Sequence, residues 1–432
     1  MIVPAEVTAE VKAAGPTRVR NRAAAFGIAL AFISYLDRAA ISQAAPLITR
    51  DLHLTTVEMG WVFSAFGLSY ALLEIPSGWW IDRKGARNVL TRVVYCWSFF
   101  TAATGWAWNY PSMFAARLLF GAGEAGCFPG IAKSFKAWLP PEERPWAEGL
   151  KAASARWGAA VAPPLVVALY AGIGWRESFL VFGLIGAVWA ACFHRWYQDD
   201  PRTHPAVNAE ELALIGTPKT RTTGSATPWR AVFTSVSAWA LSLQWFCHFF
   251  GFYFFVTWLP TYLQQARGLN MKQGAWLASA PMVFAGLGTL AGGWVLPKLI
   301  ARRGLRRARK LIGYVAYLGA SALLFAFPAI ANVYVAFGVL ALSSFVVELS
   351  TPSTWTTASD LGGEWVGLLT GTMNTLGHIG GSIAPALIAY LLAWSGNHWS
   401  LAFYCSAGLY AAGAICWAVM DPVTPLDASY AK

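Results

Sequence analysis

Four charged side chains stand out in stretches that are otherwise apolar. Asp37 and Arg38 are neighbours in FISYLDRAAISQ, residues 32–43. Arg117 and Glu124 lie seven residues apart in RLLFGAGEAGCFPG. A guanidinium binds a carboxylate through two parallel hydrogen bonds, and a carboxylate with a shifted pKa is suited to carrying a proton. Seven residues rise about 10.5 Å along one helix face, which suits two groups that line one cavity at different depths.

The elements that hold these groups follow from composition. The 432 residues are 56% hydrophobic and 12% charged, whereas a soluble domain carries about 25% charged residues. Apolar stretches of about 20 residues, each long enough to cross a bilayer as a helix, recur along the chain. We therefore expect an all-α integral membrane protein with twelve transmembrane helices. The expected spans are 23–45, 57–80, 88–108, 111–137, 147–172, 175–197, 236–262, 273–298, 309–328, 331–356, 364–393 and 399–420.

Charges inside these spans need partners. Neighbouring residues on a helix point about 100° apart, so Asp37 and Arg38 are not expected to pair with each other. An isolated charge at membrane depth is costly, and each therefore requires another helix or a water-filled cavity. The candidate partners in the first half of the chain are Glu74, Arg117, Glu124 and Arg156.

Basic residues concentrate in short connections between the spans. Arg83, Lys84, Arg87 and Arg92 follow the second span, and ARRGLRRARK, residues 301–310, follows the eighth. The positive-inside rule places these loops, and with an even number of spans both termini, in the cytoplasm. The net charge of +11 is thus explained by orientation, and no nucleic-acid partner is expected. The first apolar stretch lacks a small-residue cleavage site and is expected to be a span rather than a signal peptide.

Residues 149–165, GLKAASARWGAAVAPPL, align without gaps on residues 371–387, GTMNTLGHIGGSIAPAL. The fifth and eleventh spans are therefore internal counterparts, and two similar bundles around a midplane site are typical of a transporter.

The six cysteines show no CxxC spacing, so they predict neither a metal site nor a disulfide. The expected organisation is an N-terminal cytoplasmic arm 1–22, a six-helix bundle 23–197, a cytoplasmic linker 198–235, a second six-helix bundle 236–420 and a cytoplasmic tail 421–432.

The segment GWWIDRKGAR, residues 78–87, fits the pattern GxxxDRxGxR. In this segment the chain resembles the major facilitator superfamily, which carries the pattern between its second and third helices. The resemblance implies a gating latch rather than a substrate site. After the eighth span, Pro297 stands where the acidic residue would repeat, so the second half is expected to lack that latch carboxylate. The motif residues are Gly78, Asp82, Arg83, Gly85 and Arg87.

Further segments resemble one branch of that superfamily, the anion:cation symporters. These segments are YLDRAAIS, RxxxxxGE with a following FP, WLPTYL and GTMNTLGHIGG, together with Tyr70. Members of the branch are bacterial inner-membrane importers that couple organic acids, such as galactonate, glucarate and hexuronates, to protons. The resemblance implies a protonatable pair, Asp37 and Glu124. It implies cationic positions at Arg38 and Arg117, and substrate contacts at Tyr70 and Asn374.

Two residues differ from those typical of the branch, and the two carry opposite charges. Arg156 stands where many relatives carry a neutral polar residue, and Glu74 where they often carry Gln. Either the two compensate each other as a pair, or Arg156 faces the cavity as a second anchor for a dicarboxylate. In the internal alignment Arg156 falls opposite His378, and Asn374 lies one helical turn from His378. Arg156 and His378 are therefore added to the expected substrate site.

Glu348 in the tenth span occupies nearly the repeat position of Glu124. It is a candidate second proton site, or it pairs with His378 or meets water at the cavity mouth. His248 has no pattern around it and is interpreted as a satisfied interior histidine. Only Tyr253 and Trp258, besides Tyr70, are aromatic residues placed to touch a ligand.

The predicted function is proton-coupled import of an organic acid anion, with a sugar acid as the substrate. Protonation of Asp37 and Glu124 would free the arginines, the anion would bind them, and the bundles would then rock. Alternatives are transport of a tartrate-like or aromatic acid, or export of drugs or metabolites in exchange for protons, which the arginines in the membrane disfavour. Enzyme motifs such as HExxH and GxSxG are absent from the sequence, so no enzyme is predicted. We expect the protein to be a monomer in the lipid bilayer. No cofactor is expected apart from the coupling proton.

Overall fold

The computed structural model describes residues 15–140, 142–216, 229–363 and 366–426, and in these residues all regular structure is helical. The prediction of an all-α membrane protein is confirmed. Parts of the expected arm, linker and tail lie outside the described residues. The helices are α1 (Val19–Asp51), α2 (Thr56–Lys84), α3 (Ala86–Gly105), α4 (Tyr110–Glu124), α5 (Cys127–Trp138), α6 (Arg144–Trp196), α7 (Ala209–Ile215), α8 (Trp229–Thr234), α9 (Val236–Gln265), α10 (Met271–Arg303), α11 (Leu305–Ala326), α12 (Val333–Glu348), α13 (Thr351–Gly362), α14 (Val366–Trp394) and α15 (Ser400–Val419), with 3-10 turns at Pro201–Thr203 and Phe327–Ala329.

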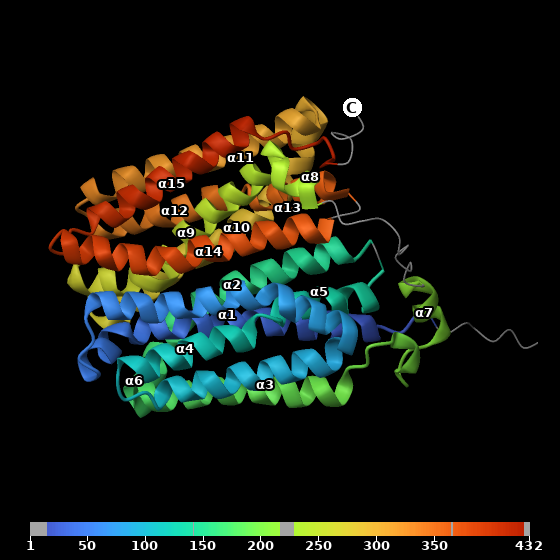
Figure 1. Cartoon of the computed structure of the whole chain (residues 1–432), viewed down its shortest axis with the longest axis horizontal. Coiled ribbons are helices and arrows are strands. Elements are labelled where there is room, and N and C mark those ends of the chain that lie inside the picture. Colours follow the sequence, from blue (N-terminus) through green and yellow to red (C-terminus); the bar gives the residue numbers. More distant parts are fainter. Residues whose placement is uncertain (1–14, 141, 217–228, 364–365, 427–432) are drawn as a thin grey trace, which may run out of the picture.

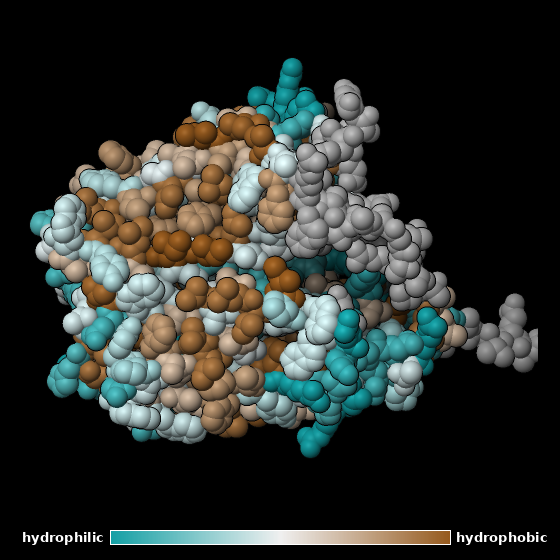
Figure 2. Space-filling model, in the orientation of Figure 1, coloured by the Kyte–Doolittle hydropathy of each residue, from teal (hydrophilic) through white to brown (hydrophobic). Residues whose placement is uncertain are grey.

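The helices form two bundles side by side, α1 to α6 and α9 to α15 (Figure 1). We call the end of the bundles that carries α7 the terminal face, and the opposite end the far face. Apolar side chains cover much of the flank, while hydrophilic side chains gather at the terminal face (Figure 2). Nine helical stretches in the described residues are long and apolar enough to cross a membrane. One of them, α6, holds two spans, because Gly174 breaks it with a φ of 84°.

Two of the predicted spans are broken at their middle. The stretch 111–137 divides into α4 and α5, and the stretch 331–356 divides into α12 and α13. The carboxylates Glu124 and Glu348 are the last residues of α4 and α12, so each sits at a break. Proline in the first turn of a helix is tolerated but does not continue the preceding helix, and Pro129 and Pro352 occupy that turn in α5 and α13.

The two bundles meet closely toward the far face. There α2 packs against α14: the Ala386 backbone N–H donates to the Ser64 hydroxyl at 3.2 Å, and the Trp61 indole donates to the Tyr390 hydroxyl at 3.2 Å. Gly67 allows this approach, because an added Cβ would lie 3.2 Å from the Cβ of Ser382. The hydrogen bonds, ion pairs and ring contacts described between the bundles lie at the helix midpoints or beyond them toward the far face.

At the terminal face the motif at residues 78–87 joins three helices of the first bundle. Gly85 makes the turn between α2 and α3 with a φ of 82°, a conformation that favours glycine. Arg87 donates from Nη2 and Nε to the His194 carbonyl near the end of α6, at 2.7 and 2.9 Å. Its backbone N–H donates to Asp199 Oδ1 at 3.0 Å. The motif therefore fixes α3 to the C-terminal end of α6.

The remaining motif residues are placed less tightly. The Arg83 guanidinium lies 4.0 Å from the ring of Trp79 on the surface. Gly78 faces Pro129 of α5, which an added Cβ would reach at 4.0 Å. Asp82 lies in α2, and its side chain is outside the described residues. The latch role implied for Asp82 therefore stays a prediction.

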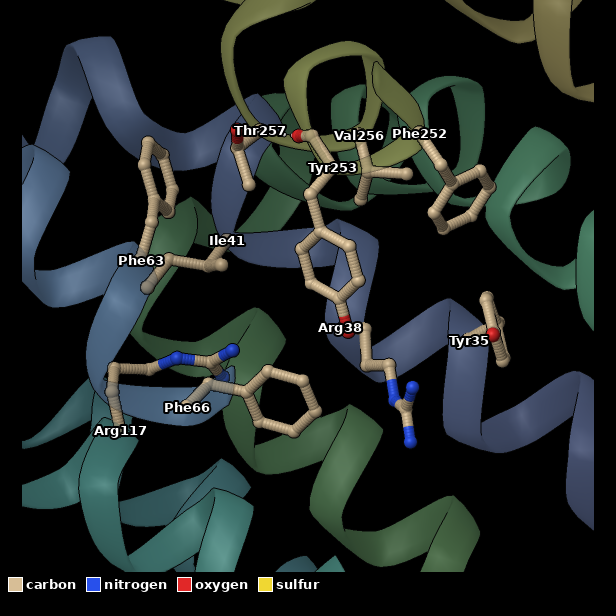
Figure 3. A pocket seen from close by; sticks show the side chains of 10 residues that line it. All are labelled: Tyr35, Arg38, Ile41, Phe63, Phe66, Arg117, Phe252, Tyr253, Val256 and Thr257. Carbon is tan, nitrogen blue, oxygen red and sulfur yellow. Dashed lines mark hydrogen bonds between the residues drawn. The ribbon is translucent and has the colours of Figure 1, made fainter. Parts of the chain in front are cut away.

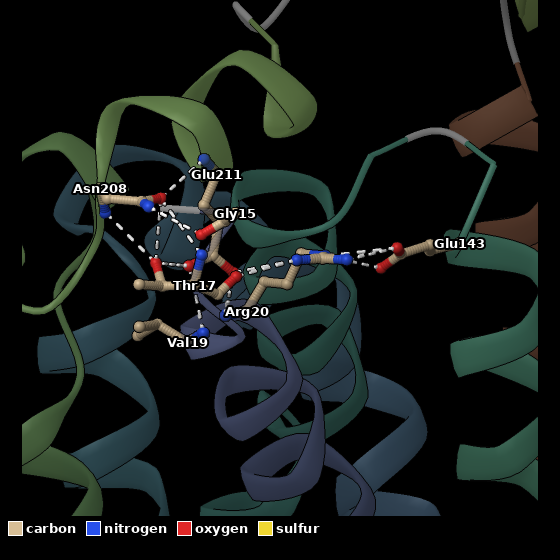
Figure 4. A network of polar contacts seen from close by, with 7 residues as sticks. All are labelled: Gly15, Thr17, Val19, Arg20, Glu143, Asn208 and Glu211. Atoms are coloured by element: carbon tan, nitrogen blue, oxygen red, sulfur yellow. Dashed lines mark hydrogen bonds and ion pairs between the residues drawn. The ribbon is translucent and has the colours of Figure 1, made fainter. Parts of the chain in front are cut away.

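A polar cluster ties the start of α1 to the linker helix α7 (Figure 4). Glu211 of α7 is fully buried and accepts hydrogen bonds from the Thr17 hydroxyl and from the backbone N–H groups of Val19 and Arg20. The Arg20 side chain bridges Glu211 and Glu143, at 3.2 and 3.0 Å. Burial alone would raise the pKa of Glu211, but these hydrogen bonds outweigh burial and hold it below its ordinary value.

Candidate functional site

A cavity lies between the two bundles (Figure 3). Side chains of α1, α2 and α4 line it from one bundle, and side chains of α9 line it from the other. A site in this position touches both halves of the molecule, as alternating access requires. The lining residues are Tyr35, Arg38, Ile41, Phe63, Phe66, Arg117, Phe252, Tyr253, Val256 and Thr257.

Arg38 pairs with Glu124 rather than with its neighbour Asp37. Its Nε donates to Glu124 Oε1 at 3.0 Å, and the Ser34 hydroxyl donates to the same oxygen. Nη2 of Arg38 and Oε2 of Glu124 are buried and have no hydrogen-bond partner among the described residues. The pair is therefore incomplete, and each member retains hydrogen-bonding capacity for another group.

Aromatic rings surround the Arg38 guanidinium. Its carbon lies 4.7 Å from the ring centre of Tyr70, 4.8 Å from that of Tyr35 and 4.9 Å from that of Phe66. Cation–π attraction stabilises a guanidinium by roughly 0.5–2 kcal/mol, most where water is excluded. The rings thus keep Arg38 in place without using its donors.

Arg117 supplies a second guanidinium to the same cavity. Figure 3 shows it across the cavity from Arg38, with the ring of Tyr253 reaching in from α9. Arg117 is 2% exposed, and its Nε and Nη1 atoms have no partner among the described residues. Its guanidinium carbon lies 4.4 Å from the ring of Phe120. Two buried guanidiniums with free donors have the chemistry that carboxylate recognition uses.

Asp37 is buried in α1 beside this cavity. It is 1% exposed, and neither carboxylate oxygen has a hydrogen-bond partner in the described part of the chain. The charges that act on it belong to Glu124 and Arg117. A carboxylate in such surroundings is a candidate for binding and releasing a proton.

Tyr70 and His378 bring α2 and α14 together beside Arg38. Their ring centres lie 4.3 Å apart, and both residues are buried. The Tyr70 hydroxyl and His378 Nδ1 have no partner in the described residues. Asn374, one turn before His378, instead accepts a hydrogen bond from the Trp245 indole at 3.2 Å. Among the expected substrate contacts, Tyr70 packs against Arg38, which lines the cavity. The side-chain oxygen of Asn374 is already hydrogen-bonded within the protein.

The possible pairing of Arg156 with Glu74 is wrong. Arg156 of α6 forms an ion pair with Glu348 of α12, with Nη2 2.7 Å and Nε 2.9 Å from Oε1. The pair is formed because both residues project into the boundary between the bundles. Glu74 remains buried at 8% exposure, with its Oε2 atom unpartnered among the described residues and Arg38 acting on it electrostatically.

Glu348 does not pair with His378 either. Its Oε2 atom accepts from the Thr289 hydroxyl at 3.0 Å and from the Thr351 hydroxyl at 2.8 Å. His248 Nε2 lies 3.4 Å from Oε1. Glu348 is 2% exposed. Neither ring nitrogen of His248 has a hydrogen-bond partner among the described residues, so the interpretation of His248 as a satisfied interior histidine is wrong.

Sequence analysis missed much of the cavity wall. Tyr35 lies in the YLDRAAIS segment but was given no role, and Phe66 and Phe252 belong to no motif; only the helix packing brings Phe66 and Phe252 to this site. Tyr253 lines the cavity, as its position suggested. Trp258 does not line it; its indole donates to the Pro385 carbonyl at 3.1 Å.

Comparison with known proteins identifies the fold and the family. The sequence model of the Major Facilitator Superfamily matches residues 27–385. The chain is 33% identical over 416 residues to the probable sulfoacetate transporter SauU of Cupriavidus necator, covering 95% of this chain and 96% of that protein. It is 31% identical to the hexuronate transporter of Bacillus subtilis, covering 87% and 89% of the two chains. It is 32% identical to the probable galactarate/D-glucarate transporter GarP of Escherichia coli K12, covering 84% and 85%.

A solved structure shares the fold. The crystal structure of a bacterial homologue of the human lysosomal transporter Spinster, in an inward-facing and occupied conformation, matches with a TM-score of 0.71 at 18% identity, covering 94% of this chain and 95% of that one. The helix order and the cavity between two bundles agree with the family match. The chain belongs to the Major Facilitator Superfamily.

Proposed function

We propose that this protein imports an organic acid anion across the bacterial inner membrane, driven by protons that enter with the substrate. The observation that carries this proposal is the pair of buried guanidiniums, Arg38 and Arg117, with free donors in one cavity between the bundles. A carboxylate or sulfonate group matches their forked geometry. Relatives named as sulfoacetate, hexuronate and galactarate/D-glucarate transporters support the same class of substrate.

Proton coupling is proposed from the carboxylates beside these cations. In the structure Glu124 occupies one donor of Arg38. Protonation of Glu124 weakens that ion pair and exposes the guanidinium to the substrate anion. Asp37 lies unpartnered beside the same charges and carries the second proton site. No cofactor other than the proton enters the cycle.

The arrangement of the bundles fits one state of an alternating-access cycle. The bundles meet from the midpoint to the far face, and the basic connections Arg83 to Arg92 and 301–310 lie at the terminal face with α7. We assign the terminal face, with both termini, to the cytoplasm. The structure then corresponds to a state that is closed toward the outside, in a protein that acts as a monomer.

The test is proton entry into proteoliposomes that contain the purified protein and a trapped pH dye. Sugar acids, small dicarboxylates, sulfonates, aromatic acids and an uncharged sugar are added one at a time. An organic acid that drives proton entry, in a way that Asp37→Asn and Glu124→Gln both abolish, supports the proposal. Proton movement driven only by an uncharged sugar or a cationic drug would overturn it.

A further inference from the structure

A second cavity adjoins the first and contains the carboxylate of Glu348. His248, Phe252, Met282, Ser344 and Glu348 are among its lining residues. Phe252 lines both cavities. Arg156, which pairs with Glu348, lies over the Phe252 ring, with its guanidinium carbon 4.3 Å from the ring centre. The Arg156–Glu348 pair therefore sits next to the cavity that contains Arg38 and Arg117.

The third guanidinium, that of Arg156, is close to the guanidinium of Arg38. The guanidinium carbon of Arg38 lies 4.8 Å from the ring centre of Tyr35, and that of Arg156 lies 5.9 Å from the same ring centre. The two carbons are thus no farther apart than the sum of these distances, 10.7 Å. One small ligand that displaces the Tyr35 and Phe252 rings reaches both cations.

We propose that Arg156 is a specificity residue that binds the second anionic group of a dianionic substrate, and that Glu348 occupies Arg156 while that group is absent. The inference rests on the proposed function, because it assigns the second charge of the same transported anion. A buried cation without a partner is costly, so the empty protein needs an internal anion at this position. Glu348 fills that role at 2.7 Å.

The surroundings of Glu348 allow this exchange. When Arg156 turns toward the substrate, Glu348 keeps the hydroxyl donors of Thr289 and Thr351 and has His248 Nε2 3.4 Å away. The carboxylate therefore stays solvated by the protein. A monoanion has no group to replace Glu348 and leaves the pair intact. The exchange also releases α12 of one bundle from α6 of the other, so binding of a dianion loosens the contact at the midpoint.

The test compares ligands that differ in one anionic group. Galactarate and galactonate form one pair, and sulfoacetate and 2-hydroxyethanesulfonate form the other, since in each pair a carboxylate replaces a hydroxymethyl group. Binding is measured as the ligand-induced rise in melting temperature of purified protein, and transport as proton entry into proteoliposomes. We expect Arg156→Gln to weaken dianion binding at least tenfold and to change monoanion binding less than about twofold. We expect Glu348→Gln, which removes the competing anion, to strengthen dianion binding.

Two further variants separate specificity from stability. Arg156→Gln/Glu348→Gln replaces the ion pair by two neutral side chains. It is expected to fold even if a single variant, which leaves one buried charge without its partner, does not. Arg309→Gln removes another buried arginine, whose ion pair with the exposed Asp360 carboxylate at 2.7 Å lies within one bundle, and is expected to leave the ratio of dianion to monoanion affinity unchanged. Equal losses for monoanions and dianions in Arg156→Gln and in the double variant would overturn the inference while leaving the proposed function standing. If no organic acid of either charge binds the wild-type protein or drives proton entry, the proposed function itself fails.

Discussion

Arg38 and Glu124 share a single hydrogen bond between their charged groups, from Nε to Oε1 at 3.0 Å, while Nη2 and Oε2 stay buried without partners in the described chain. A complete guanidinium–carboxylate pair makes two such bonds. A buried charge that lacks part of its hydrogen bonding is costly. The arrangement is therefore suited to exchange, because a proton on Glu124 or an anion on Arg38 removes the mismatch.

Glu124→Gln is expected to abolish proton-coupled net uptake and to preserve exchange of external for internal substrate. Glutamine keeps the shape of the side chain and its acceptor oxygen but carries no titratable proton. Exchange moves no net protons, so it continues if Arg38 still binds the anion. The measurement is net uptake beside counterflow in the same proteoliposomes. Asp37→Asn is the parallel variant, and Glu210→Gln on the linker helix is the control. Proton-coupled uptake at the wild-type rate in Glu124→Gln would refute the coupling role.

Arg117→Lys is expected to raise the KM for the substrate at least tenfold, equivalent to about 1.4 kcal/mol of binding free energy. Lysine keeps the positive charge but lacks the planar fork that meets two oxygens at once. The protein is expected to fold normally, because Arg117 Nε and Nη1 have no hydrogen-bond partners among the described residues that the substitution would remove. Initial uptake rates against substrate concentration give the KM. Arg202→Lys, in the linker region, is the matched control. An unchanged KM would show that Arg117 does not bind the substrate.

Gly67→Leu is expected to open the far face. Even a Cβ at this position would lie 3.2 Å from the Cβ of Ser382, and a leucine side chain forces α2 away from α14. The variant disfavours the observed state and shifts the population to the opposite one. The readout is labelling of a cysteine placed at Ser64, which is 3% exposed here, by a membrane-impermeant maleimide.

In the Ser64→Cys background, Gly67→Leu should label several times faster than its parent. Gly172→Leu is the control, because no atom lies within 4 Å of an added Cβ at that position. Labelling that is equally slow in all three proteins would mean that the α2–α14 contact does not limit opening of the far face.

Glu211→Gln is expected to destabilise the protein by about 1–3 kcal/mol at neutral pH, the range for weakening hydrogen bonds to a buried charged group. The folded protein holds the pKa of Glu211 below its ordinary value, so ionised Glu211 stabilises the fold above the ordinary glutamate pKa. This contribution is lost as the pH falls through the lowered pKa.

Melting temperatures measured from neutral to acidic pH test this linkage. The difference between wild type and Glu211→Gln should be largest near neutral pH and should shrink in acid. Glu210→Gln, next in sequence on the same short helix, should show no such trend. A difference that grows on acidification would contradict the assigned sign.

The sequence by itself determined the membrane class, the helix order and the candidate charges, because these depend on local composition and on repeats. Apolar stretches of spanning length identify helices wherever they lie. The motif at residues 78–87 and the charges from Asp37 to Glu124 are visible without coordinates. Even the absence of an Asp37–Arg38 pair followed from the geometry of a single helix.

Only the tertiary structure decided which charges meet. Arg156 and Glu348 are 192 residues apart and pair across the two bundles, an outcome that no helical period encodes. The breaks after Glu124 and Glu348, the aromatic rings around Arg38 and the shared wall at Phe252 also depend on how helices pack. Partner choice among buried charges is set by the lowest total cost of desolvation over the whole bundle. Such a sum includes every neighbouring helix, and it is defined only once all of them are in place.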